Sequence, residues 1–295
     1  EYDMLDMVTS RFDKVIVVLN TLTSFQCDFI YEYNNMPSNP RIDALMWIGG
    51  PGDTGANAIG GLLTGEANFS GRTVDTFVRD FSKDPTWQNF GDNTQVNGGA
   101  NGSSYMEGTA ATSDYFVAYE EGIYVGYRYY ETRGYEESKY DANIDWYGEN
   151  VIFPFGYGLS YTQFEQTMTM SGDLEDGNSS LTFNVTVTNI GDVAGKDVVQ
   201  LYVTLPYYQG GIEKSRVQLV DFAKTRPLAP DESQTITFIV DATTLQVTTI
   251  TTQTATDIPA TNWTAATTFS MRLQIRTWTE DRTFMQRLQQ RSIIP

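Results

Sequence analysis

The stretch from Phe153 to Phe164 separates two parts of the chain that have different hydrophobic patterns. Before it, apolar runs alternate with helical patterns, and after it most apolar segments alternate with a period of two. The stretch itself contains five aromatic residues and two glycines, a composition suited to a tightly turning backbone that packs large rings. The sequence therefore predicts an α/β region and an all-β region that meet at a packed junction.

The first part contains two runs that are typical of buried strands. Met4 to Phe12 has apolar residues at helical spacing, and the β-branched run Val15 to Leu19 follows it. A short helical pattern, Phe29 to Tyr33, precedes the second run, Ala44 to Ile48. We expect the first run to be a strand that is buried on both faces and the second run to be another buried strand, both in an α/β layer.

Gly50 to Gly55 has the spacing G-x-G-x-x-G between a predicted strand and the predicted helix Ala56 to Leu63. This is formally the context of a dinucleotide-binding turn, which would make the chain an oxidoreductase domain. However, Pro51 lacks a backbone N–H, and Asp53 would place negative charge where a pyrophosphate lies. We therefore favour a tight turn that binds no phosphate, and we expect no cofactor.

The second part predicts short antiparallel strands. Leu181 to Thr188 alternates strictly, Val198 to Val203 is apolar, and Thr235 to Val240 alternates again. Phe269 to Ile275 is a candidate closing strand, whereas Thr243 to Thr268 is rich in threonine and has no core pattern. Strands with regular turn signals of this kind indicate an immunoglobulin-like or fibronectin-type sandwich.

Charge and composition exclude several classes of function. With 37 acidic and 19 basic residues, the formal charge of -18 repels nucleic acid and anionic membrane surfaces. The absence of histidine excludes a Ser-His-Asp or Cys-His apparatus and every histidine-containing metal site. The single cysteine, Cys27, has apolar neighbours and is interpreted as a small buried residue; we expect no metal.

The segment from Tyr119 to Glu131 is dense in tyrosine. Its alternating residues Ile123, Val125 and Tyr127 predict one face of a strand. Tyrosine faces can stack on the apolar faces of sugar rings, but they serve domain interfaces at least as often, and we favour interface packing.

Three blocks of the sequence resemble one enzyme family. Glu121 to Tyr130 is similar to the E-G-I-Y-V-G-Y-R-Y segment of family 3 glycoside hydrolases, typified by β-glucosidases, and Phe153 to Phe164 is similar to their F-P-F-G-Y-G-L-S-Y-T-x-F segment. Gly52 to Thr76 resembles their glycine-rich turn, helix and N-P-S-G-(R/K) loop, with Phe69 in place of the proline. Val185 to Thr225 is similar to their fibronectin-type domain. The resemblance covers about residues 1 to 240.

This resemblance implies the architecture. The expected fold class is a three-layer α/β sandwich with a mostly parallel sheet, followed by an all-β fibronectin type III or immunoglobulin-like sandwich. We expect the α/β sandwich, truncated at its N-terminus, in residues 1–164, the β-sandwich in residues 165–280, and an unassigned tail in residues 281–295.

The resemblance also implies a reaction, retaining hydrolysis of β-glycosides by two carboxylates about 5–5.5 Å apart. The resemblance places the nucleophilic Asp in a barrel domain outside this chain and the acid/base Glu upstream of Glu1, so no catalytic residue is expected here. Glu121 is expected to position its surroundings, with Arg128 as a candidate partner. The implied partners are a β-glucoside or oligosaccharide and the missing barrel domain, and a homo-oligomer is possible. The alternative is a non-catalytic carbohydrate-binding or adhesion module.

Two further features bear on the surface. Residues from Lys83 to Thr112 predict a long surface excursion, which is typical of a functional loop or of one that lies against another domain. N-x-S/T acceptor triplets begin at five positions, and they favour an extracellular or cell-surface location over the cytoplasm without establishing it. These positions are Asn68, Asn101, Asn178, Asn184 and Asn262.

Overall fold

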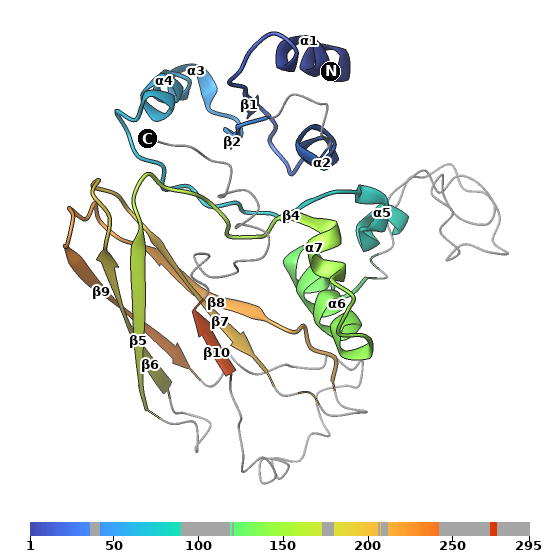
Figure 1. The fold of residues 1–295 in the computed structure, drawn as a ribbon. Helices are drawn as coiled ribbons and strands as arrows, with labels where there is room; N and C mark the ends of the chain where they lie inside the picture. The colour runs from blue at the N-terminus through green and yellow to red at the C-terminus, as the bar shows by residue number, and fades with distance from the viewer. Residues whose placement is uncertain are drawn as a thin grey trace, which may run out of the picture. The chain divides into compact units, whose positions relative to one another are not determined.

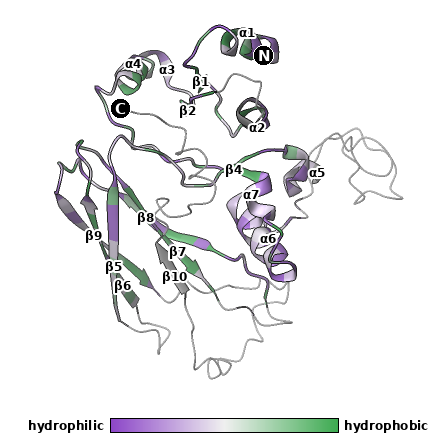
Figure 2. Ribbon diagram, viewed as in Figure 1, coloured by the Kyte–Doolittle hydropathy of each residue, from purple (hydrophilic) through white to green (hydrophobic). Residues whose placement is uncertain are grey.

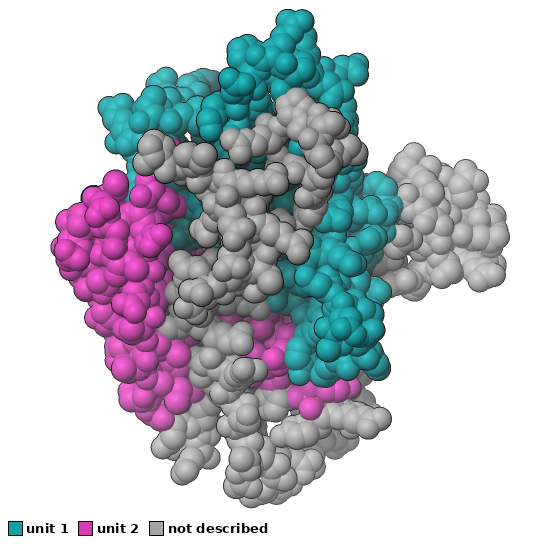
Figure 3. Space-filling view, viewed as in Figure 1, with its two compact units in different colours: residues 1–159, 278–295 teal, residues 160–277 magenta. Residues whose placement is uncertain are grey.

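A computed structural model describes residues 1–35, 42–89, 119, 121–172, 180–205, 207, 212–241 and 272–275. The chain divides into two compact units, whose described residues lie within 1–159 for unit 1 and within 160–277 for unit 2 (Figure 3). Among the described residues, no helix is long and apolar enough to cross a membrane.

Unit 1 begins with two helices and two parallel strands, as the sequence predicts (Figure 1). The elements are α1 (Tyr2–Thr9), β1 (Ile16–Leu19), α2 (Asp28–Asn35) and β2 (Ala44–Trp47). Strand β1 pairs with β2 in parallel, with Ile16 opposite Ala44 and Leu19 opposite Trp47. Cys27 is fully buried in the core beneath these strands, which confirms its predicted structural role.

The prediction that β1 is buried on both faces is wrong for the described chain. Leu19 is buried, but Ile16 is 48% exposed and Val18 is 38% exposed. The reason is that the core formed by Leu19, Cys27 and Phe29 covers one side of the strand pair. A continuously apolar strand is buried on both faces only when a second layer covers the other side.

The glycine-rich segment forms a strand-to-helix turn. Gly52 has a φ of +65°, a conformation that glycine adopts without strain. The short helix α3 (Gly52–Gly55) follows, with Pro51 at its N-cap, and α4 (Asn57–Thr64) continues from it. Helix α4 confirms the predicted helix, and it ends at Gly65, whose φ of +79° is the left-handed C-cap conformation.

The predicted strand at residues 123–127 is wrong, because this segment is a turn that leads into a helix. Gly122 and Gly126 have φ values of +57° and +56°, so the backbone cannot stay extended through them. Helix α6 (Tyr127–Tyr140) begins at the next residue and is coloured largely as hydrophilic in Figure 2. The remaining elements of unit 1 are β3 (Phe77–Val78), η1 (Phe81–Lys83), α5 (Pro85–Asn89), α6 (Tyr127–Tyr140), α7 (Trp146–Asn150) and β4 (Val151–Phe153), with β3 and β4 antiparallel.

Unit 2 consists of two antiparallel sheets that share one core (Figure 1). One sheet has the order β5-β6-β9 and the other β10-β7-β8. Their strands are β5 (Phe164–Gly172), β6 (Ser180–Asn189), β9 (Ser233–Asp241), β10 (Arg272–Ile275), β7 (Val198–Thr204) and β8 (Gln218–Lys224). Strand β6 alternates buried and half-buried residues along its whole length, so the period-two prediction is confirmed.

The predicted turn after β6 contains a buried polar network. The Asn189 side chain is fully buried, and its Oδ1 accepts hydrogen bonds from Thr162 Oγ1 at 2.7 Å and from the Gly191 N–H at 3.1 Å. Its Nδ2 donates to the carbonyls of Val193 and Leu228, both at 2.9 Å. Every hydrogen-bonding position of this amide is therefore used, as burial requires.

Some predicted features lie outside the described residues. They are most of the Lys83–Thr112 excursion, the Thr-rich run at 243–268, Phe269 and Met271 of the closing strand, the tail 281–295, and the acceptor triplets at Asn101, Asn178 and Asn262. Leu273 and Ile275 do lie in a strand, β10, which pairs with β7.

Candidate functional site

Two of the three sequence blocks meet in unit 1 through backbone and side-chain hydrogen bonds. The Thr73 hydroxyl donates to the Pro154 carbonyl at 2.6 Å and accepts from the Tyr157 N–H at 2.9 Å. The Thr73 backbone exchanges hydrogen bonds with the Tyr157 carbonyl and the Gly156 N–H. Arg72 donates to the Gly158 carbonyl at 2.8 Å. The loop after α4 is thus fastened along residues 154–158.

Gly158 is required by this close approach. A Cβ atom at position 158 would lie 2.3 Å from the Gly71 carbonyl oxygen, a backbone atom that cannot turn aside. Gly158, the second glycine of the F-G-Y-G sequence, therefore allows its backbone to lie close to the backbone of Gly71.

The third block contacts the same segment. The Tyr127 ring stacks on the Phe155 ring with centroids 4.7 Å apart, and the Arg128 guanidinium lies 6.0 Å from the Tyr127 centroid. Phe153 stacks on Tyr157 at 5.4 Å. Tyr161, in contrast, is 40% exposed.

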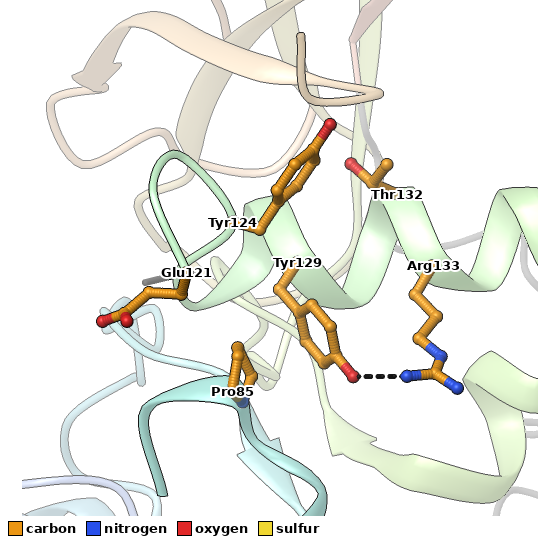
Figure 4. A pocket seen from close by; sticks show the side chains of 6 residues that line it. All are labelled: Pro85, Glu121, Tyr124, Tyr129, Thr132 and Arg133. Carbon is orange, nitrogen blue, oxygen red and sulfur yellow. Dashed lines mark hydrogen bonds between the residues drawn. The ribbon is translucent and has the colours of Figure 1, made fainter. Parts of the chain in front are cut away.

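A pocket of about 330 Å³ opens beside the start of α6 (Figure 4). It is lined by Pro85, Glu121, Tyr124, Tyr129, Thr132 and Arg133. In Figure 4 the Arg133 guanidinium lies next to the Tyr129 hydroxyl, whereas the Glu121 side chain extends away from the other labelled side chains. The pocket therefore combines aromatic rings with one anionic and one cationic group.

The side chains on the helical side of the pocket are held in place by their neighbours. Arg133 donates to Tyr129 Oη at 2.9 Å and to Glu137 at 3.2 Å, and its guanidinium lies 5.1 Å from the Trp146 ring centroid. Tyr129 donates to the Lys83 carbonyl at 3.3 Å. Tyr129, Arg133 and Glu137 follow one another at intervals of four residues, the spacing that aligns side chains on one helix face.

Tyr130, which lies on the same helix, is buried and packs against Trp146. The Tyr130 ring is 1% exposed, stacks on Trp146 with centroids 6.0 Å apart, and donates from its hydroxyl to Asp84 at 3.1 Å. Burial and the nearby Asp84 carboxylate raise the pKa of Tyr130, because both disfavour the phenolate.

Burial likewise raises the pKa of the Cys27 thiol to about 12, so Cys27 is not a nucleophile at neutral pH.

The pocket does not contain the carboxylate pair that glycoside hydrolysis requires. Of the six described residues that line it, Glu121 alone has a carboxylate. Two carboxylates about 5–5.5 Å apart are needed for the retaining reaction. In the part of the chain that the structure describes, no three His, Cys, Asp or Glu side chains gather as a metal site.

The sequence predicted part of this site and missed part of it. Glu121 was singled out, but Tyr124, Tyr129 and Arg133 were not placed in a pocket, because the segment was interpreted as a strand. The i, i+4 spacing of Tyr129, Arg133 and Glu137 is the signal that could have identified the helix.

Comparison with known proteins places these blocks in a family. Residues 1–127 match the model of the glycosyl hydrolase family 3 C-terminal domain, and residues 197–261 match that of the fibronectin type III-like domain. The chain belongs to glycosyl hydrolase family 3. Within this family it has the C-terminal domain followed by the fibronectin type III-like domain.

Similar family 3 proteins are β-glucosidases. The chain is 33% identical to β-glucosidase A of Butyrivibrio fibrisolvens over 249 residues, which are 80% of this chain and 25% of that protein. It is 32% identical to a β-glucosidase of Ruminococcus albus, covering 81% of this chain and 20% of that protein. The chain thus spans a quarter or less of the length of these two relatives.

Solved structures of the family have the same fold. A β-glucosidase from Paenibacillus barengoltzii superposes with a TM-score of 0.63 at 33% identity, covering 80% of this chain and 22% of that one. β-Glucosidase 3B from Thermotoga neapolitana, solved in complex with α-D-glucose, gives a TM-score of 0.58 at 30% identity, covering 81% of this chain and 28% of that one.

Proposed function

We propose that this chain is part of a retaining, β-glucosidase-like exo-glycoside hydrolase, in which it supports and walls the active site without supplying the catalytic carboxylates. The natural substrate is then a β-glucoside or an oligosaccharide. The observation that carries the proposal is that 80% of the chain aligns, at 33% identity, with a quarter of a β-glucosidase.

The proposal includes the parts of the architecture that go beyond the family assignment. Residues 1–164 form the N-terminally truncated part of a three-layer α/β sandwich with a mostly parallel sheet, and residues 165–280 form the fibronectin type III-like sandwich. The parallel pairing of β1 with β2 and the two antiparallel sheets of unit 2 support this division. The tail 281–295 has no assigned role.

A barrel domain outside this chain supplies the nucleophilic Asp in this proposal, and the acid/base Glu also lies outside residues 1–295. Glu121 positions its surroundings. The lone carboxylate in the described pocket supports this assignment, since one carboxylate cannot perform a double displacement. The assembly of the protein into a homo-oligomer remains part of the proposal.

The test uses an aryl β-glucoside as substrate. We expect no turnover above the buffer rate by the 295-residue chain, and normal turnover by a longer natural protein that contains it together with a barrel domain. In that longer protein, Glu121→Gln should retain kcat within about threefold. Hydrolysis by the 295-residue chain at enzymatic rates, abolished by Glu121→Gln, would show that the assignment of roles is wrong.

A second measurement, combined with this assay, addresses the alternative of a non-catalytic carbohydrate-binding module. If intact mass and terminal sequencing of the natural protein find no barrel domain, the enzyme proposal fails and binding becomes the remaining function. If they find one and the longer protein cleaves the glucoside, the module alternative fails.

A further inference from the structure

The N-x-S/T triplet that begins at Asn184 has no part in the roles proposed above. It is one of the two triplets whose first residue lies in the described chain, the other being at Asn68. Asn184, Val185 and Thr186 lie in β6, the central strand of the sheet β5-β6-β9. Because successive residues of a strand point to opposite faces, the buried Val185 faces the core and the two polar residues of the triplet face outward.

The neighbours of Asn184 on the outer face are short and uncharged. Across the sheet it lies opposite Thr169 on β5 and Thr237 on β9, which are both exposed. Along β6, the residues two positions before and after it are Thr182 and Thr186. A bulky, hydrophilic group on the Asn184 amide therefore meets neither a large ring nor a charge among these four neighbours.

The hydrogen bond that orients the Asn184 amide is compatible with modification of its nitrogen. Asn184 Oδ1 accepts from the Thr237 hydroxyl at 2.7 Å. A sugar joined to Nδ2 replaces one of the two amide protons and leaves Oδ1 as an acceptor. Among the described residues, Nδ2 donates no hydrogen bond to the protein, so the modification removes no bond from the sheet.

We propose that Asn184 is an acceptor of an N-linked glycan, which projects from the outer face of the sheet β5-β6-β9. The co-reactant is an oligosaccharide carried on a lipid diphosphate in a secretory compartment. In the transfer, Nδ2 bonds to C1 of the first sugar while the bond from C1 to the diphosphate oxygen breaks, the amide loses one proton, and the lipid diphosphate leaves. Since transfer precedes folding, the fold must accommodate the glycan, and an outward position on the sheet keeps it in solvent.

The test is mass spectrometry of glycopeptides, which scores residue 184 separately from the other triplets, on the natural protein and on the 295-residue chain secreted from a eukaryotic host cell. We expect a glycan at Asn184 in both. Enzymatic removal of the glycan should leave the melting temperature of the secreted chain unchanged, because the glycan replaces no contact within the sheet. Thr186→Val should abolish the glycan at residue 184, since the transferase requires the hydroxyl of the triplet.

The matched control is Thr235→Val on β9. The Thr186 and Thr235 hydroxyls are hydrogen-bonded to each other at 2.8 Å, so both variants break the same bond, but Thr235→Val leaves the triplet intact and should retain the glycan. An unmodified Asn184 in the natural protein or in the secreted chain, an equal loss of the glycan in both variants, or secretion of the chain only after Asn184→Gln would overturn the proposal. Since hydrolysis is not measured, this outcome is separate from the fate of the proposed glycosidase activity.

Discussion

Strand β6 in unit 2 and strand β1 in unit 1 are both rich in β-branched residues, yet they are buried in different ways. In β6 every second residue is buried, and Val185 and Val187 have no exposed surface. In β1 the pattern is irregular, and Ile16 and Val18 remain accessible. Strand β6 has partners on both sides, β5 and β9, whereas the strand that pairs with β1 in the described sheet is β2.

The difference shows that an apolar strand sequence indicates that the strand is buried, but does not indicate which element of the structure covers it. In unit 2 the two sheets of the same chain cover each other and form one core with Phe183, Leu201 and Phe238. In unit 1 the described core covers one face of the β1–β2 pair. Ile16 and Val18 lie outside that core.

The largest expected effect tests the closed core of unit 2. Phe183→Ala should lower the free energy of unfolding by about 3–5 kcal/mol, because the ring is 1% exposed and its removal leaves a cavity among packed neighbours. The change is measured by denaturant unfolding, with hydrogen exchange used to assign it to unit 2.

The matched control for Phe183→Ala is Ile239→Ala on β9. Ile239 is 66% exposed, so the same kind of truncation should cost less than about 1 kcal/mol. Equal losses in the two variants would mean that the core of unit 2 is not closed as the structure describes.

A smaller effect is expected at the polar centre of the same unit. Asn189→Ala should destabilise the protein by about 2–3 kcal/mol, because it removes the hydrogen bonds that the buried amide makes with the Thr162 hydroxyl and with the Val193 and Leu228 carbonyls. Hydrogen exchange should then speed up at residues near Leu228 before it does so in unit 1. The control is Thr237→Val, which removes an exposed hydroxyl that donates to Asn184 Oδ1. It should change stability by less than about 0.5 kcal/mol.

The comparison of β6 with β1 also explains which strands could be predicted from the sequence. The period-two pattern predicted β6 and β9, and the apolar run predicted β7, because each of these strands shows its burial in its own residues. Strand β5 was not predicted, since its inward residues are Phe164, Gln166 and Met168 and the rest of the strand is exposed, which is a weak alternation. The partners of Asn189, which are up to 39 residues away in the chain, leave no local pattern.

The residues of the candidate site could likewise be predicted only where the local sequence carries a signal. Glu121 and the blocks at 52–76, 121–130 and 153–164 stood out by their resemblance to a known family. Their mutual contacts, such as Thr73 with Pro154, join residues 81 positions apart and depend on the fold. The helix that places Arg133 next to Tyr129 was missed because alternating Ile123, Val125 and Tyr127 imitate a strand, while the positive φ values of Gly122 and Gly126 are invisible in the pattern.

The smallest expected effect is also the most direct test of the difference in burial between β1 and the strands of unit 2. In the 295-residue chain, Ile16→Thr should change the free energy of unfolding by less than about 0.5 kcal/mol, because the side chain is 48% exposed and both residues favour strands. In a longer natural protein whose additional layer covers β1, the same substitution should cost about 1–3 kcal/mol, since it places a hydroxyl in an apolar contact. Denaturant unfolding of both proteins measures the difference, and Ile239→Thr in unit 2 should cost the same in each. Equal costs for Ile16→Thr in the two proteins would show that the exposed face of β1 has no covering layer, and its apolar sequence would then need another explanation.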